Sequence, residues 1–200
     1  EDLDLVIRET RRCASIIRRL LDFARVKVPS NGLFDLNQVV DETVRFVDRP
    51  ANLQNIEIVT ELDPALPRIW GDADLVKQVV LNIVVNATQA IEGQGRVVVA
   101  TRTVGEPDAP AQQQVELTIR DNGCGIPEAN LQRIFDPFFT TKEVGKGTGL
   151  GLSVSYGIVR AHRGTIQVDS TPGEGTCFRI RLPVQAPAEG IEHTEGKVPT

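Results

Sequence analysis

Cysteine and long apolar runs are scarce in this chain, and each shortage excludes a class of protein. The three cysteines, Cys13, Cys124 and Cys177, are odd in number and far apart in the 200 residues, so no disulfide framework is predicted. No apolar run approaches the roughly 20 residues that a membrane-spanning helix needs, and no signal peptide opens the chain. We therefore expect a reducing, cytoplasmic setting and no membrane contact by this segment.

A basic cluster is also missing. The formal net charge is -5, with 22 Lys and Arg against 27 Asp and Glu, so we expect no nucleic-acid partner. The 40% of hydrophobic residues is enough for one good core plus an appendage. Because residue 1 falls inside a helical pattern, we expect the chain to be part of a longer protein.

Four segments can be distinguished along the chain. Residues 1–28 predict an amphipathic helix, whose apolar seam is Leu3, Val6, Thr10, Cys13, Ile17, Leu20 and Ala24, at alternating steps of three and four. A helix with so apolar a face packs into a bundle. Residues 29–34 are predicted as a linker, 35–184 as the folded domain and 185–200 as a disordered tail rich in Pro, Glu and Gly.

The folded domain mixes helices with strands. Helices are expected at about 35–47, 72–92, 127–135 and 148–161, and strands at 56–62, 68–71, 96–104, 114–121, 164–170 and 176–183. Asp35 and Gln38 match a capping box for the first of these helices. The second of these helices has an apolar face made of Leu75, Val79, Ile83, Ala87, Ala90 and Ile91. Most successive strands can form hairpins, which favours an α+β fold, a two-layer α/β sandwich with helices on one face of a mostly antiparallel sheet.

Two polar motifs stand out within these elements. Asn82 and Asn86 are one helical turn apart and project from one face, where they either face solvent or meet polar partners. Asp121 ends a strand and precedes Gly123 and Gly125, a pattern typical of a plain turn. Alternatively, its carboxylate accepts a hydrogen bond from an exocyclic amine such as adenine N6, and the glycines let a flat ring lie against the backbone.

Two adjoining stretches, FDPFFTTK at 135–142 and GKGTGLGL at 145–152, combine aromatic residues with alternating glycines. The aromatic cluster predicts a local mini-core that anchors one end of a mobile lid, so that Lys142 and Lys146 face phosphate oxygens. The glycine-rich run is either a flexible loop or a backbone that approaches phosphates closely. It is neither a Walker A loop nor a dinucleotide fingerprint.

A last glycine pair, Gly173 and Gly175, lies in TPGEGTCF between the final two expected strands. This spacing predicts a tight hairpin turn. The hydroxyl of Thr176, directly after the turn, is placed to reach a purine directly or through water.

In this order, the motifs N-x3-N, D-x-G-x-G, F-D-P-F-F, G-x-G-x-G-L-G-L and G-x-G-T resemble the N, G1, F, G2 and G3 boxes of sensor histidine kinases. Those kinases belong to the Bergerat-fold ATPase and kinase superfamily. The resemblance covers about residues 35–183, and NATQA, IFDPFFTTK and GTGLGL are similar to the nitrogen-regulator or oxygen-sensor type. The stretch IIRRLLDFAR resembles the second helix of the family's dimerisation and phosphotransfer hairpin.

The resemblance implies that ATP and Mg²⁺ bind here. It implies that Asn86 ligates Mg²⁺, that Asp121 reads the adenine amine, and that Asn82 supports the phosphate side. The other implied nucleotide-binding residues are Gly123, Gly125, Lys142, Lys146, Gly147, Thr148, Gly149, Leu150, Gly151 and Thr176. The glycines at 145–151 would form a lid and a helix start whose backbone N–H groups stabilise the triphosphate.

Asn82 occupies the position that distinguishes the kinases of this superfamily from its ATP hydrolases. The hydrolases carry a glutamate four residues before the Mg²⁺-ligating asparagine, as the general base for water. Asn82 stands at that position, and a neutral amide accepts no proton near pH 7. We therefore expect a protein-histidine kinase, with a degenerate kinase acting as a nucleotide-gated interaction module, or a hydrolase clamp, as alternatives.

No residue of this sequence is assigned a catalytic role, because the family's phosphoacceptor histidine lies on a hairpin helix that the 200 residues do not include. His162 is predicted to cap a turn, His193 lies in the tail, and Cys124 is predicted to be a small packing residue. The resemblance implies phosphoryl transfer to the missing histidine and then to an aspartate on a response-regulator receiver domain. It also implies a homodimer through the first helix, weaker than the family's four-helix bundle.

Overall fold

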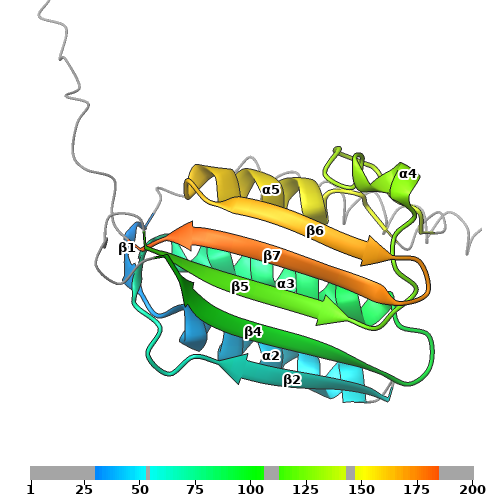
Figure 1. Ribbon diagram of the computed structural model, residues 1–200, viewed down its shortest axis with the longest axis horizontal. Helices are drawn as coiled ribbons and strands as arrows, with labels where there is room; N and C mark the ends of the chain where they lie inside the picture. The colour runs from blue at the N-terminus through cyan, green and yellow to red at the C-terminus, as the bar shows by residue number, and fades with distance from the viewer. Residues whose placement is uncertain (1–29, 53–54, 106–112, 143–146, 185–200) are drawn as a thin grey trace, which may run out of the picture.

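The structure, a computed structural model, is a two-layer α/β sandwich (Figure 1). It describes residues 30–52, 55–105, 113–142 and 147–184. A five-stranded sheet forms one layer, helices cover one of its faces, and a two-stranded ribbon lies at one end. This architecture confirms the predicted fold class.

Apart from β1, which lies in the predicted linker, the elements follow the order expected from the sequence. The sheet contains, from edge to edge, β2 (Ile56–Leu62), β4 (Gly95–Val104), β5 (Gln114–Asp121), β7 (Gly175–Pro183) and β6 (Thr165–Thr171). The helices are α2 (Leu36–Asn52), α3 (Ala73–Gln89), the short α4 (Glu128–Leu131) and α5 (Gly151–Ala161). Strands β1 (Gly32–Phe34) and β3 (Ile69–Gly71) form the ribbon. In the described part of the chain, no helix has the length and apolarity to cross a membrane.

The sheet is mostly antiparallel, as predicted, but its β2–β4 edge is parallel. Ile56 lies opposite Gly95 in that pair, and β3 and α3 lie between the two strands in the sequence. A parallel pair needs such a crossover because the chain must return to the starting end of the sheet. Strand β5 lies in the centre of the sheet, between β4 and β7. Its last residue lies at the end of the sheet from which the chain continues to α4 (Figure 1).

Helix α3 lies between α2 and α5 and packs on the centre of the sheet (Figure 1). Its buried residues are Val76, Val79, Val80, Ile83, Val84, Ala87 and Thr88. Of the apolar face named from the sequence, Leu75 and Ala90 are only half-buried, whereas Val76, Val80 and Val84 are buried in addition. Neighbouring helices on both sides and the sheet below widen the buried face beyond the single stripe that the sequence pattern indicates.

Several helix boundaries differ from the prediction. Helix α2 continues to Asn52, whereas α4 ends at Leu131 and gives way to turns. Asp35 caps α2, since its Oδ1 accepts hydrogen bonds from the backbone N–H groups of Asn37 at 2.8 Å and Gln38 at 3.3 Å. A capping box would also have the Gln38 side chain bonded to the backbone of Asp35. Instead, the Gln38 side chain donates a hydrogen bond to Glu42 at 3.0 Å.

Part of the predicted linker belongs to the folded unit. Residues 32–34 form β1, which pairs antiparallel with β3 and places Leu33 opposite Trp70. A strand of three residues is too short to show a periodic pattern, which is why the sequence did not reveal it. The predicted first helix and the predicted tail lie outside the described residues, so the proposed boundaries at 28 and 185 stay predictions.

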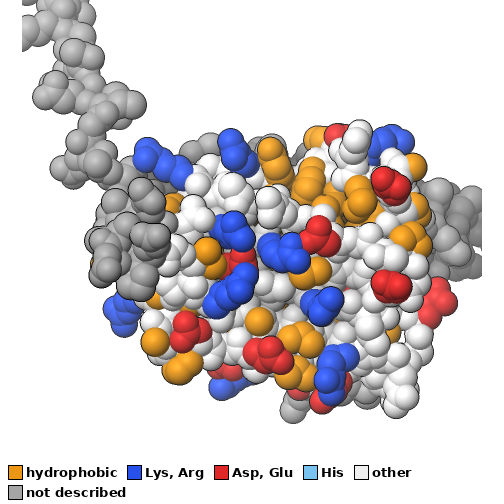
Figure 2. All heavy atoms as spheres, in the orientation of Figure 1, with side chains coloured by type: hydrophobic (Ala, Val, Ile, Leu, Met, Phe, Trp, Pro, Cys, Tyr) orange, Lys and Arg blue, Asp and Glu red, His pale blue; other side chains and the backbone are white. Residues whose placement is uncertain are grey.

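The sheet face opposite the helices carries charged side chains (Figure 2). Glu116, in the middle of β5, is 1% exposed, and its oxygens accept hydrogen bonds from Arg102 of β4 and Arg181 of β7, each at 2.7 Å. Burial acts to raise the pKa of Glu116, but the hydrogen bonds and charges of Arg181 and Arg102 outweigh it, and the pKa lies below its ordinary value. This ion-pair ladder joins three strands on the outer face.

Candidate functional site

Asp121 lies at the end of β5 and is only 5% exposed. Its Oδ1 accepts hydrogen bonds from the backbone N–H groups of Gly123 at 2.9 Å and Thr176 at 3.2 Å. Within the described residues, no hydrogen bond is made to its Oδ2. Burial raises the pKa of Asp121, and the two backbone hydrogen bonds only partly counter that effect. One carboxylate oxygen is thus fixed by the fold and the other is left for an incoming donor.

Glycines around Asp121 are required by close backbone packing. A Cβ at Gly123 would lie 2.4 Å from the carbonyl oxygen of Ala90, and a Cβ at Gly125 would lie 2.2 Å from that of the last residue of β6. Gly175 has a φ of +114°, and a Cβ there would lie 2.0 Å from the carbonyl oxygen of Asp121. These positions hold the loop after β5 against the end of α3 and against the β6–β7 hairpin.

Thr176 is joined to a residue that the sequence did not indicate. Its Oγ1 is 2.9 Å from the Oγ of Ser170, which donates to the carbonyl oxygen of Gly175 at 2.9 Å and accepts from the N–H of Ile126 at 2.8 Å. Because Ser170 uses its one proton on that carbonyl, the Thr176 hydroxyl is the donor of the pair and keeps its acceptor lone pairs. The sequence did not indicate Ser170 because its contact with Thr176 depends on the register of the β6–β7 hairpin, in which the two residues lie opposite each other.

Asn86 and Lys142 meet on the exposed side of α3. The Nζ of Lys142 donates to Asn86 Oδ1 at 3.1 Å and also to Gln89 Oε1. Burial lowers the pKa of Lys142. Gln89 was missed in the sequence, although its position three residues after Asn86 places it on the same helical face. Two side-chain amide oxygens therefore face one cationic group.

Asn82, one turn before Asn86, contacts a different element. Its Nδ2 donates to the carbonyl oxygen of Gly151 at 3.2 Å and to the Oγ of Ser155 at 3.3 Å. These bonds join α3 to the first turn of α5. The asparagine pair thus has polar partners, rather than simply facing solvent.

Helix α5 begins at Gly151, a few residues later than the predicted start near Thr148. Leu150 occupies the N-cap position, and no side chain forms a cap hydrogen bond there. The first backbone N–H groups of a helix have no partner within the helix, and they carry the positive end of its dipole. This end opens directly after the glycine-rich loop, of which Gly145 and Lys146 lie outside the described residues.

The glycine-rich loop packs closely against the FDPFFTTK stretch. Gly149 has a φ of +67°, and a Cβ there would lie 2.3 Å from the carbonyl carbon of Phe138. A Cβ at Gly147 would lie 2.7 Å from the Oγ1 of Thr140. At Gly151, by contrast, the nearest atom would be 3.7 Å away, so protein packing alone does not demand glycine there.

The predicted aromatic mini-core is present for two of its three phenylalanines. Phe135 packs against Tyr156 of α5 with ring centroids 5.3 Å apart, and Phe139 packs against the core beneath the guanidinium of Arg133. Phe138 is 62% exposed and has a φ of 67°. The stretch is therefore fixed at Phe135 and Phe139, while Phe138 points outward.

Two further predictions can be compared with the structure. Cys124 donates its backbone N–H to Ala90 at 2.9 Å, but its side chain is exposed, so the prediction of a packing residue was wrong. His162 ends α5, with Nδ1 2.8 Å from the carbonyl oxygen of Ile158, and its Nε2 accepts the backbone N–H of Asp72 at 3.0 Å. Both ring nitrogens of His162 are thus engaged in holding α5 to the start of α3.

Residues 71–186 match the protein family described as "Histidine kinase-, DNA gyrase B-, and HSP90-like ATPase". The chain is 39% identical over 184 residues to the signal transduction histidine-protein kinase AtoS of Escherichia coli, covering 92% of this chain. It is 36% identical over 198 residues to the sensory histidine kinase/phosphatase NtrB of Rhodobacter capsulatus, covering 94% of this chain. It spans 29% of the first relative's length and 54% of the second's, less than two thirds of either.

Solved structures agree with the sequence relatives. The catalytic domain of the histidine kinase ThkA superimposes with a TM-score of 0.67 and 29% identity, covering 78% of this chain and 96% of that one. A complex of ThkA with the response regulator protein TrrA gives a TM-score of 0.72 at 25% identity, covering 91% of this chain and 50% of that one. The chain therefore belongs to the histidine kinase-, DNA gyrase B- and HSP90-like ATPase family, and its relatives in that family are sensor histidine kinases.

Proposed function

We propose that this chain is the ATP-binding catalytic part of a sensor histidine kinase. In the proposal, the γ-phosphoryl group of ATP passes to a histidine outside these 200 residues and then to an aspartate on a response-regulator receiver domain. The observation that carries the proposal is the environment of Asn82, a neutral amide bonded to the first turn of α5 where a hydrolase needs a base. The cytoplasmic location inferred from cysteine usage is part of the same proposal.

Adenine recognition is assigned to Asp121 and Thr176. The unbonded Oδ2 of Asp121 is placed to accept a hydrogen bond from the exocyclic amine, because Oδ1 is held by two backbone N–H groups. The Thr176 hydroxyl keeps acceptor capacity and supplies a second polar contact, directly or through water. Gly123 and Gly125 support the site by holding the loop after β5 close to α3 and β6.

Phosphate recognition is assigned to the start of α5 and to Lys142. The proposed donors to the anionic oxygens are backbone N–H groups of the loop and of the helix start, at Gly147, Thr148, Gly149, Leu150 and Gly151. Lys142 adds a positive charge from the adjoining stretch, and Lys146 is proposed to do the same from outside the described residues. Asn82 orients this end of α5 through its two hydrogen bonds.

Asn86 is assigned to Mg²⁺. A side-chain amide oxygen is the kind of ligand that this cation accepts, and Asn86 Oδ1 already faces the ammonium group of Lys142 together with Gln89 Oε1. The described residues contain no group of three or more His, Cys, Asp or Glu side chains that could hold a metal ion. Bound Mg²⁺ would neutralise charge on the triphosphate, and Lys142 would then be free to turn from Asn86 toward a phosphate oxygen.

The protein partners follow from the same proposal. One neighbouring structure, ThkA with TrrA, is described as a histidine kinase in complex with a response regulator protein, which supports a receiver domain as partner. The homodimer through the first helix is proposed from its apolar seam and from its resemblance to the second helix of the family's dimerisation hairpin. His162 is not proposed as an acceptor, since both of its ring nitrogens are engaged within the domain.

Radiolabelled ATP tests the proposal. The longer native protein should acquire acid-labile label, whereas the 200-residue chain alone should acquire none and should release little free phosphate. An Asp121→Asn variant of the native protein should acquire less label at limiting ATP, which separates site-dependent transfer from contamination. Steady phosphate release by the 200-residue chain would contradict the kinase assignment in favour of a hydrolase. ATP binding without label in the native protein would favour the nucleotide-gated module.

A further inference from the structure

Ser170 lies opposite Thr176 in the β6–β7 hairpin, at the end of the sheet where β5 also ends (Figure 1). The backbone N–H of Thr176 donates to Asp121 Oδ1 at 3.2 Å, and both of these residues are 5% exposed. Thr176 is therefore held beside the carboxylate to which adenine recognition is assigned. Ser170 has no role in that assignment, although its Oγ is 2.9 Å from the Thr176 hydroxyl. What Ser170 adds to the site follows from the directions of its hydrogen bonds.

The direction of every hydrogen bond at Ser170 is determined by its partners. A serine hydroxyl has one proton and two acceptor lone pairs. The carbonyl oxygen of Gly175, at 2.9 Å, can only accept, so it receives the proton. The N–H of Ile126, at 2.8 Å, can only donate, so it occupies one lone pair. The second lone pair must then accept the proton of the Thr176 hydroxyl, and the bonding capacity of Ser170 is fully used.

Thr176 consequently presents oxygen lone pairs, and no proton, to a ligand. The Oδ2 of Asp121 is also an acceptor while the carboxyl group is ionised, and none of the described residues donates to it. Two acceptors thus lie where the 6 position of the purine is proposed to bind. A 6-aminopurine brings N–H donors to that position, whereas a 6-oxopurine brings a carbonyl oxygen, which has only lone pairs of its own.

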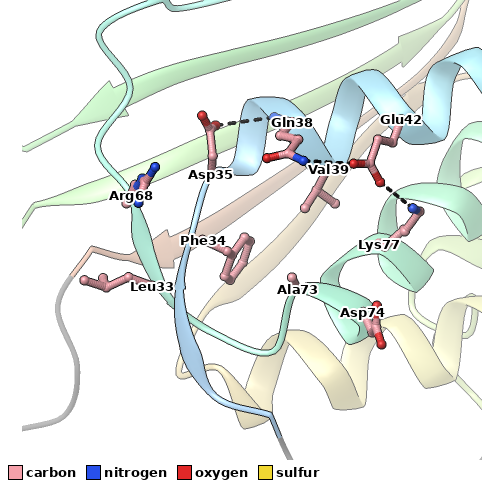
Figure 3. Close-up of a pocket in the computed structure, with 10 residues that line it drawn as sticks. All are labelled: Leu33, Phe34, Asp35, Gln38, Val39, Glu42, Arg68, Ala73, Asp74 and Lys77. Carbon is pink, nitrogen blue, oxygen red and sulfur yellow. Dashed lines mark hydrogen bonds and ion pairs between the residues drawn. The ribbon is translucent and has the colours of Figure 1, made fainter.

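A hollow of about 350 Å³ beside β1 provides a contrast (Figure 3). There Glu42 accepts hydrogen bonds from Lys77 at 2.6 Å and from Gln38 at 3.0 Å, so the acceptor and its donors satisfy one another. Groups that are paired in this way give a ligand no fixed preference for a donor or an acceptor. At Thr176, the internal bond takes up the donor and leaves the acceptor, which is a directional preference.

We propose that Ser170 is a positioning residue that makes the site favour 6-aminopurine over 6-oxopurine nucleotides, by holding the proton of Thr176. The inference rests on the proposed ATP-binding function. A threonine hydroxyl that rotates freely can turn its proton toward the carbonyl oxygen of a 6-oxopurine. The bond to Ser170 removes this donor, so the carbonyl oxygen is left unpaired against two acceptors. Leaving a polar group unpaired in this way is how binding sites reject close analogues most strongly.

Calorimetric titrations of the 200-residue chain with ATP and with inosine triphosphate (ITP) test the proposal. ITP is the matched probe, because it has the same triphosphate and carries a carbonyl oxygen in place of the 6-amino group. Burial raises the pKa of Asp121, so mildly alkaline buffer is used to keep the carboxylate charged. The unsubstituted chain should prefer ATP. In Ser170→Ala, the ratio of ATP affinity to ITP affinity should fall by about threefold to tenfold, the effect of one neutral hydrogen bond.

A double-mutant cycle shows whether Ser170 acts through Thr176. Thr176→Val replaces the hydroxyl with a methyl group and should itself lower the ratio, because the carbonyl oxygen of ITP no longer meets lone pairs. Adding Ser170→Ala to Thr176→Val should change the ratio no further. Thr171→Ala, which removes an exposed hydroxyl from the next residue of β6, is the matched control and should leave the ratio unchanged.

The outcomes separate this inference from the proposed function. Failure of the unsubstituted chain to bind ATP would contradict the proposed function itself. ATP binding with an unchanged ratio in Ser170→Ala would overturn the inference alone, as would a further fall in the ratio when Ser170→Ala is added to Thr176→Val. If Ser170→Ala does not fold, Thr176→Val decides, because an unchanged ratio in that variant would show that the hydroxyl does not select the base.

Discussion

The N-terminal ends of α3 and α5 show two ways of satisfying the same backbone groups. At α3, the buried carboxylate of Asp72 accepts hydrogen bonds from the N–H groups of Asp74 at 3.0 Å and Leu75 at 3.1 Å. At α5, Leu150 makes no side-chain cap bond, and a glycine-rich loop precedes the helix. Both ends attract negative charge. One receives it from the chain itself, and we propose that the other receives it from a phosphate.

The two helix ends also differ in what surrounds them. A Cβ at Gly71, just before α3, would lie 2.4 Å from the ring of His162, so side chains fill that end. Around the start of α5, loop backbone lies close to other loop backbone, as at Gly149. A capped end contributes to stability, whereas an uncapped end gives up stability and keeps donors for a ligand. The predictions below test this division of roles.

The largest effect is expected for Gly149→Ala. A methyl group there would meet the backbone of Phe138 at 2.3 Å, in a conformation with φ of +67° that alanine rarely adopts. The loop must then shift, and a displacement of about 1 Å in a site can cost on the order of a hundredfold. We expect a loss of that order in ATP affinity by calorimetry. Affinity within twofold of the unsubstituted chain would show that the loop conformation does not matter for binding.

Asp121→Asn should weaken ATP binding by roughly tenfold to more than a hundredfold, because a hydrogen bond involving a charged partner contributes about 1.5–3 kcal/mol. The melting temperature should not fall, since burial raises the pKa of this carboxyl and so disfavours its charged form in the folded state. Calorimetry and thermal unfolding on one preparation measure both. Unchanged affinity would contradict the adenine assignment.

The raised pKa of Asp121 also predicts a pH dependence. As the pH falls through this raised value, the acceptor is protonated, and affinity should drop by up to about tenfold per pH unit. Stability moves oppositely for this group, because a pKa raised on folding gives a contribution that is present at low pH and lost as pH rises through it. ATP titrations from neutral to acidic pH, with Asp121→Asn as reference, measure the effect. Parallel pH profiles would argue against it.

Asp72→Ala should lower the free energy of unfolding by about 0.5–2 kcal/mol, the usual contribution of an N-cap side chain. Urea denaturation measures this loss. ATP affinity should stay within twofold, because the α3 N-terminus lies at the other end of the helix from Asn86. A large loss of affinity with unchanged stability would reverse the proposed roles of the two helix ends.

The smallest effect is expected for Gly157→Ala, in the interior of α5. No atom lies within 4 Å of the added methyl group, and the substitution should raise the free energy of unfolding by about 0.5–1 kcal/mol. ATP affinity should not change. This variant is the control for Gly149→Ala, since both add one methyl group to the same chain segment. Destabilisation by Gly157→Ala would show that α5 needs flexibility as well as an open end.

Local chemistry made most of the fold predictable. The capping residue Asp35 and the apolar face of α3 are patterns within one segment, and the two helices were predicted close to their observed positions. Elements held by distant partners were harder to find. Strand β1 depends on β3, and the wide buried face of α3 depends on α2 and α5, so neither could be derived from its own residues.

For the candidate site too, some features follow from the sequence and others only from the tertiary structure. The sequence by itself determined which residues are proposed to carry the chemistry, because Asp121, Asn86 and the glycines occur in motifs whose spacing is fixed along the chain. Only the tertiary structure decided that Ser170 supports Thr176, that Gln89 shares Lys142, and that none of the described residues donates a hydrogen bond to the second oxygen of Asp121. Hydrogen bonds between segments far apart in sequence depend on strand register and helix packing, and these are settled only when the whole core assembles.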